Sequence, residues 1–104
     1  MHSSKFTVHV DRAAYQKMYA HVEFLARVSV TAAERLQDTF CAVLESLEEN
    51  PRGYPRYEPL GDISADLRSK LFAKRYRIVF EIRDDDVYVY DIQDCRQDID
   101  KNLI

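Results

Sequence analysis

The sequence predicts an α+β fold in which a two-helix hairpin covers one face of a largely antiparallel sheet. Three observations predict it. A short stretch of alternating apolar residues comes first, two stretches with apolar residues three or four apart follow, and three strand-like stretches separated by short breaks come last. The 104 residues suit a single domain spanning 1–104, and 46% hydrophobic residues with only two glycines exclude a disordered chain.

The first predicted element is a short strand over residues 5–10. Its alternation turns His9 to the face opposite the three apolar residues, which are Phe6, Val8 and Val10. Asp11 is the expected N-cap of a first helix that ends near residues 27–29. The apolar stripe of that helix is expected to comprise Tyr15, Met18, Val22 and Leu25, while His21 is expected on the helix surface.

A second helix is predicted to begin at Thr31, because Thr31 and Glu34 have the spacing of a capping box. Pro51 cannot continue the helical hydrogen bonds, so the helix is expected to end at Asn50. Its expected buried face comprises Ala33, Leu36, Phe40, Val43 (or Leu44) and Leu47. Residues 51–61 contain all the prolines and glycines and two tyrosines, which predicts a loop packed by aromatic rings.

Three meander strands are predicted over residues 67–73, 75–83 and 87–92. Within the second, the apolar face is expected to comprise Tyr76, Ile78, Phe80 and Ile82. The third is β-branched and aromatic on both faces, which suits a central place in the sheet. Three aspartates at 84–86 are expected to form a turn, because adjacent residues cannot all face one metal ion.

Charge is divided along the second half of the chain, although the formal net charge is only −3. Residues 67–83 contain six cations against one acid, and residues 84–100 contain seven aspartates against one arginine. The net charge disfavours non-specific nucleic-acid binding, whereas the basic segment is the one place that favours it.

Targeting features are absent from the sequence pattern. No apolar run approaches the length of a membrane span, and residues 1–5 do not resemble a signal peptide. Two cysteines, Cys41 and Cys95, are more typical of reduced thiols than of a disulfide framework. We therefore expect a cytoplasmic protein without a membrane interaction, a metal or a cofactor.

The basic segment carries a family resemblance. It reads Tyr-Arg-Ile-Val-Phe at residues 76–80, after a basic strand and before an acidic turn, an apolar strand and Arg96. This arrangement, with the helix hairpin before it, resembles the RelE/ParE toxin superfamily over about residues 5–98. The resemblance implies the plasmid-stabilisation type of toxin, the RelE/ParE fold, and neutralisation by a cognate antitoxin that wraps an exposed strand edge and a basic groove.

The family contains two chemical branches. RelE-like members are endoribonucleases (mRNA interferases) that cut messenger RNA in the ribosomal A site, whereas ParE-like members poison DNA gyrase. The RelE-like endoribonuclease is the leading hypothesis and a ParE-like gyrase inhibitor is the alternative. Under the leading hypothesis, the resemblance implies that the catalytic residues are Lys70, Arg77 and Arg96. Lys70 would act as the base, Arg77 would stabilise charge and Arg96 would lie near the leaving group. Substrate-binding residues would be Arg68, Lys74, Arg75 and Tyr76.

Alternatives remain open at this point. On a solvated sheet face, Arg68, Lys70 and Arg77 also serve as ion-pair and solubility residues. Residues 97–104 lack the tyrosine or histidine that RelE-like nucleases often carry there, which favours the gyrase branch. A third hypothesis is an inactive family member that only binds its antitoxin. The expected partners are therefore an antitoxin, messenger RNA and the ribosome or alternatively gyrase, and a homodimer is compatible with each.

Overall fold

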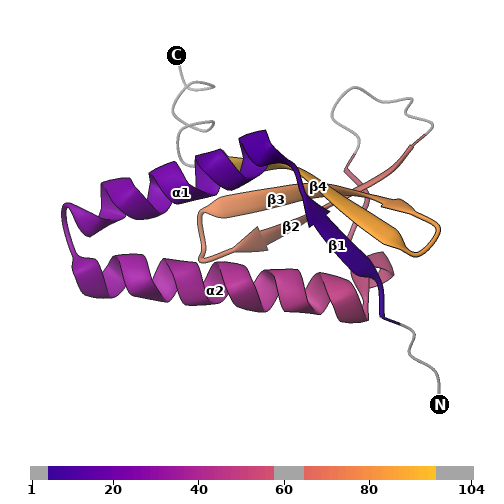
Figure 1. Ribbon diagram of the computed structural model, residues 1–104, viewed down its shortest axis with the longest axis horizontal. Coiled ribbons are helices and arrows are strands. Elements are labelled where there is room, and N and C mark those ends of the chain that lie inside the picture. The colour runs from indigo at the N-terminus through magenta and orange to yellow at the C-terminus, as the bar shows by residue number, and fades with distance from the viewer. Residues whose placement is uncertain (1–4, 58–64, 96–104) are drawn as a thin grey trace.

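The elements follow the predicted order, and the α+β class is confirmed (Figure 1). The structure is a computed structural model that describes residues 5–57 and 65–95. Its elements are β1 (Thr7–Val10), α1 (Arg12–Ala26), α2 (Val30–Glu49), the 3₁₀ turn η1 (Pro51–Gly53), β2 (Asp66–Phe72), β3 (Tyr76–Arg83) and β4 (Asp86–Asp94).

One four-stranded sheet has the order β1-β4-β3-β2. The last three strands form an antiparallel meander, and β1 pairs in parallel with β4, with Thr7 opposite Asp86. The prediction that the third meander strand is central is confirmed, because β4 lies between β1 and β3. The predicted turn before it is confirmed as well, and Asp84 adopts a positive φ of 53° there.

Helix α1 begins where the sequence predicts. Asp11 caps it, with Oδ2 accepting a hydrogen bond from the N–H of Ala13 at 3.0 Å. The predicted stripe is wrong at one position, since Tyr15 is 59% exposed whereas Ala14 is fully buried. Ala14 and Met18 lie one turn apart on the face against the sheet, and Tyr15 is rotated about 100° from Ala14.

Helix α2 begins earlier than predicted. Ser29 is its N-cap, with Oγ accepting from the N–H of Ala32 at 3.1 Å, so the capping box expected between Thr31 and Glu34 is wrong. Any hydroxyl residue before the apolar stripe can cap a helix, and Ser29 has the extended backbone that a cap needs. The predicted buried face and the end before Pro51 are both confirmed.

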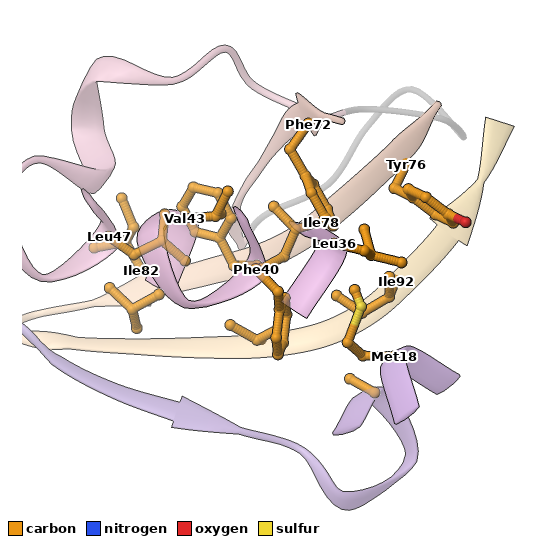
Figure 2. Packing of buried hydrophobic residues seen from close by; sticks show 14 residues of the cluster. Met18, Leu36, Phe40, Val43, Leu47, Phe72, Tyr76, Ile78, Ile82 and Ile92 are labelled. Carbon is orange, nitrogen blue, oxygen red and sulfur yellow. The ribbon is translucent and has the colours of Figure 1, made fainter. Parts of the chain in front are cut away.

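The core lies between the helix hairpin and one face of the sheet (Figure 2). Residues from both helices, such as Met18 and Phe40, pack against alternate residues of the meander, such as Ile78 and Ile92. The predicted apolar face of β3 is confirmed, because Tyr76, Ile78, Phe80 and Ile82 are all buried. Neither α1 nor α2, which lie wholly in the described ranges, is long and apolar enough to cross a membrane.

The connection after α2 is packed by aromatic rings, as predicted, over residues 51–57. The Tyr54 ring meets the Phe80 ring edge-on at 6.2 Å, and its hydroxyl donates to Ser46 Oγ at 2.9 Å. The remaining part of the predicted loop, residues 58–61, lies outside the described residues.

Candidate functional site

The two predicted basic residues of β2 lie on the helix side of the sheet. Arg68 donates from Nη1 to the carbonyls of Arg52 and Tyr54 at 2.8 and 2.9 Å, and from Nε to Asp66 at 3.0 Å. Its side chain is only 17% exposed. Arg68 therefore ties the end of η1 to the sheet, and most of its hydrogen-bonding capacity is already in use.

Lys70 shares the face of Arg68, as the two-residue spacing predicts. It stands opposite Ile78, which is fully buried under the helices, and it lines a hollow with residues of α2. Its Nζ lies 5.0 Å from the centre of the Tyr54 ring, a cation–π contact. Lys70 thus faces α2 across the edge of the sheet.

Arg77 faces the other way. Its neighbours Tyr76 and Ile78 are buried under the helices, so the strand alternation turns Arg77 to the opposite face of the sheet. We call this the outer face; it carries Arg77, Glu81, Arg83, Tyr88 and Gln93. Arg77 Nη1 lies 3.5 Å from Gln93 Oε1, and its guanidinium lies 6.0 Å from the Tyr57 ring. Both contacts are long, which leaves this guanidinium able to fork onto an anionic group.

A polar network supports Arg77 from neighbouring elements. Gln93 Nε2 donates to the Tyr57 hydroxyl at 3.2 Å and to Asp91 Oδ2 at 3.4 Å. Asp91 in turn accepts from Lys17 of α1, which pairs with it as an ion pair. The network therefore joins α1, β3, β4 and residue 57 around one arginine.

The other half of the outer face is held by Glu81. Arg83 donates to both of its carboxylate oxygens at 2.9 and 3.2 Å, and the Tyr90 hydroxyl donates at 2.6 Å. These hydrogen bonds, that of Arg83 first, lower the pKa of Glu81 below its ordinary value, and the bond to Glu81 raises the pKa of Tyr90. Arg83 is thereby committed to a neighbour, unlike Arg77.

Aromatic and acidic groups extend the outer face onto β1. The rings of His9 and Tyr88 stack at 4.8 Å with 14° between their planes, and His9 Nε2 lies 2.9 Å from Asp86. The prediction that His9 faces away from the apolar side of its strand is confirmed. The guanidinium of Arg83 lies 4.8 Å from the same tyrosine ring. This half of the face thus mixes aromatic rings with charges of both signs.

The turn between β2 and β3 holds the remaining predicted residues. Arg75 pairs with the buried Asp94 at 2.8 Å, a hydrogen bond that raises the pKa of Arg75 above its ordinary value. Tyr76 is buried, and its ring lies 5.0 Å from that of His21. The expectation of a surface His21 is wrong, because Nε2 is buried and burial lowers its pKa. Lys74 is exposed at the tip of the turn.

The predicted residues are therefore divided among three places. Arg68 and Lys70 lie on the helix side, Arg77 lies on the outer face, and Lys74 and Arg75 lie at the turn. Arg96 lies outside the described residues. In the described ranges, no three His, Cys, Asp or Glu side chains come together as a group that could hold a metal ion.

The structure adds residues that the sequence pattern did not identify. Tyr57 and Gln93 contact Arg77, and Lys17 pairs with Asp91 in the same network. Asp94 and His21 lie beside Arg75. A signal was available for Gln93 alone, which lies two residues beyond Asp91 and so shares its face of the strand. The others come from elements far away in the chain.

A helix hairpin on one face of a β1-β4-β3-β2 sheet, with arginines distributed over its meander, is consistent with the fold of RelE/ParE toxins. The family model of the ParE toxin of the type II toxin–antitoxin system parDE matches residues 8–99, and the chain belongs to this family. It is the toxin component of such a system, and its family implies an antitoxin partner. No curated protein matches the sequence.

Proposed function

We propose that this toxin acts by binding a protein target, DNA gyrase, as ParE-like toxins do, and that it does not cut RNA. The observation that carries the proposal is the separation of Lys70 from Arg77. Lys70 lies against Tyr54 on the helix side, and Arg77 lies beside Gln93 on the outer face.

Metal-independent RNA cleavage requires several groups to act on one phosphate. The base, the groups that stabilise the transition state and the acid must all come within hydrogen-bond reach of it. Lys70 and Arg77 point away from each other through the sheet, so one phosphate cannot contact both. Arg68 and Arg75 are held by backbone carbonyls and by Asp94 respectively, and neither is free to replace Lys70 beside Arg77.

The composition of the outer face also supports a protein target. Tyrosine and arginine are the residues that dominate protein–protein interfaces, and this face has Tyr57, Tyr88 and Arg77 partly exposed. Glu81 and Asp91 on the same face pair with Arg83 and Lys17, so these two cations are not free to bind a phosphate backbone. The net charge of the whole chain, −3, also disfavours binding to a nucleic acid.

The endoribonuclease hypothesis remains the alternative, with one observation in its favour. Arg77 has only long polar contacts and lies next to the Tyr57 ring, an arrangement suited to a phosphate and a stacked base. The inactive-member hypothesis is the third possibility. One experiment separates all three.

The experiment combines purified toxin with gyrase and, in parallel, examines RNA in cells that produce the toxin. We expect loss of DNA supercoiling, growth arrest, and messenger RNA that stays intact by primer extension. Codon-phased cuts in messenger RNA that disappear in Arg77→Ala would overturn the proposal and establish the nuclease. Normal growth together with unaffected gyrase would leave the inactive member.

A further inference from the structure

The edge of the sheet at β1 has backbone groups that are open for pairing. β1 is an edge strand (Figure 1), and Thr7 N–H donates to the carbonyl of Asp85 at 3.0 Å, on the side of β4. The alternation of the strand therefore turns the N–H and C=O groups of Val8 and Val10 away from β4. Among the described residues, none of these groups has a backbone partner. The edge thus offers two donors and two acceptors.

The neighbouring positions limit the length of this open edge. Phe6 N–H points the same way, but it already donates to the carbonyl of Glu48 at the end of α2 at 2.8 Å. Asp11 N–H points back to Val89 of β4 at 2.9 Å, and the chain then turns into α1. The open edge is therefore two hydrogen-bonding positions long, which suits an equally short strand.

The open edge is complementary to itself in one register. In an antiparallel pair, the residues that exchange both hydrogen bonds stand directly opposite each other. A two-fold axis at His9 places Val8 of each copy opposite Val10 of the other, so that every open donor meets an open acceptor. An axis at Val8 or at Val10 forms only one such pair, because the N–H of Phe6 is taken and residue 12 is helical.

Charges beside the edge are complementary in the same register. The axis at His9 brings the beginning of α1 of one copy to the end of α2 of the other, because Phe6 stands opposite residue 12 and bonds to Glu48. The positive end of one helix dipole then lies near the negative end of the other. Arg12 and Glu48, which are exposed and partly exposed, approach each other there with opposite charges.

Exposed aromatic rings lie next to the open edge. Tyr15 and Tyr19 of α1 are 59% and 61% exposed, and together with Val10 and Arg12 they line a hollow of about 520 Å³. Tyrosine and arginine contribute strongly to the free energy of protein–protein binding when a partner covers them. A partner seated on the β1 edge would therefore cover side chains suited to an interface.

We infer that two copies of this toxin pair through β1 into a symmetric dimer, which joins their four-stranded sheets into one. A second copy supplies a strand of the right length, a register that satisfies every open group, and the opposite charge at each end. Such an interface uses the same patch on both subunits, as two-fold dimers do. The outer faces of the two copies then lie on one side of the joined sheet. The inference does not depend on whether the toxin acts on gyrase or on RNA.

The first test is a charge exchange in the purified full-length toxin, with association followed by sedimentation velocity over a range of concentrations. Arg12→Glu and Glu48→Arg each place like charges together across the axis, whereas Arg12→Glu/Glu48→Arg restores opposite charges in exchanged positions. Each change favours its own helix dipole, so folding should be preserved, and thermal melts establish this. The matched control is Arg27→Glu, which makes the same charge change at the other end of α1.

We expect the wild type to dimerise and each single variant to associate about tenfold or more weakly at low salt. The double variant should recover most of this loss, and the control should associate like the wild type. A wild type that stays monomeric at its highest soluble concentration would overturn the inference. A double variant that associates as weakly as the single variants would overturn it as well.

The second test uses the wild-type dimer, so it does not depend on the folding of a variant. Within one extended strand the amide protons of Val8 and Val10 are about 7 Å apart, too far for a nuclear Overhauser effect. Across the inferred strand pair the same two protons face each other. A mixture of isotope-labelled and unlabelled toxin should therefore show an effect between them across the two copies. A dimer without this effect pairs through another surface, and the inference is then wrong.

Discussion

Replacing Ala73 by glycine is expected to stabilise the protein, because the turn between β2 and β3 is built from residues poorly suited to it. Arg75 N–H donates to the carbonyl of Phe72 at 3.3 Å across this turn. The two residues between them, Ala73 and Lys74, have φ values of 51° and 67°. Positive φ at both central positions is typical of a type I′ turn, which favours asparagine and glycine.

The magnitude follows from two opposing effects. The left-handed region costs an L-residue about 1–2 kcal/mol, and glycine avoids this cost. Glycine also makes the unfolded chain more flexible, which costs about 0.4–1 kcal/mol. Ala73→Gly should therefore raise the free energy of unfolding by about 0.5–1 kcal/mol, which corresponds to an increase of about 3–6 °C in the melting temperature.

Urea unfolding measures this change, and a matched control comes from α1. Ala20→Gly is the same substitution at an exposed position inside a helix, where it should destabilise the protein by about 1 kcal/mol. The two variants should thus shift the urea midpoint in opposite directions with an unchanged slope. If Ala73→Gly destabilises the protein as Ala20→Gly does, the turn does not hold Ala73 in the left-handed region and the reasoning fails.

Three further predictions concern caps and titrating groups. Ser29→Ala should lower the free energy of unfolding by about 1 kcal/mol, whereas Thr31→Ala should change it by less than about 0.5 kcal/mol. If urea unfolding shows equal losses of stability for both variants, Thr31 also caps the helix and the assignment of Ser29 as the cap is wrong. The pKa of Glu81 is lowered chiefly by Arg83. Glu81 therefore stabilises the fold at pH values above its ordinary pKa of 4.5, and this stabilisation is lost as the pH falls further. Glu81→Gln should flatten the acid side of the stability profile, and a profile like that of the wild type would contradict this role. Burial lowers the pKa of His21 below its ordinary value of 6.5, so the unfolded chain binds this proton more readily than the folded protein does, and stability should fall as the pH drops below 6.5. Thermal melts at about pH 7 and about pH 5.5 measure this fall in stability, which should be smaller in His21→Asn than in the wild type. An equal fall in both proteins would mean that other groups cause it.

The parts of the fold that the sequence predicted are those with a strong local pattern. The stripe from Ala33 to Leu47 repeats over several turns, and the alternation from Tyr76 to Ile82 is unbroken, so both buried faces could be assigned. The phase of α1 was harder to assign, because Tyr15 is large and apolar enough to pass for a core residue next to the smaller Ala14.

The division of the basic residues could not be predicted, because it depends on strand register. A shift of one residue turns every side chain of a strand to the other face. The turn at residues 73–75 contains no glycine, proline, asparagine or aspartate, so no residue type indicated where the turn begins and ends. Strands predicted over 67–73 and 75–83 left one residue between them, whereas the structure has three, with Phe72 opposite Tyr76.

The surroundings of Arg77 could not be predicted from the sequence for a different reason. Lys17 meets Asp91, and Tyr57 meets Gln93, through pairings between elements far apart in the chain. No local pattern records such contacts. The Arg75–Asp94 pair is of the same kind, because it joins the turn after β2 to the end of β4.

The parallel pairing of β1 with β4 has a consequence for the time at which the protein becomes active in a cell. The first strand to leave the ribosome pairs with the last strand of the sheet, since Thr7 lies opposite Asp86. Until residues 86–94 have been synthesised, β1 has no sheet to join and β3 lacks its neighbour on one side. Closing so long a stretch of chain is the slow kind of folding step. The sheet, and with it the face that carries Arg77, therefore cannot be completed before residue 94 has left the ribosome.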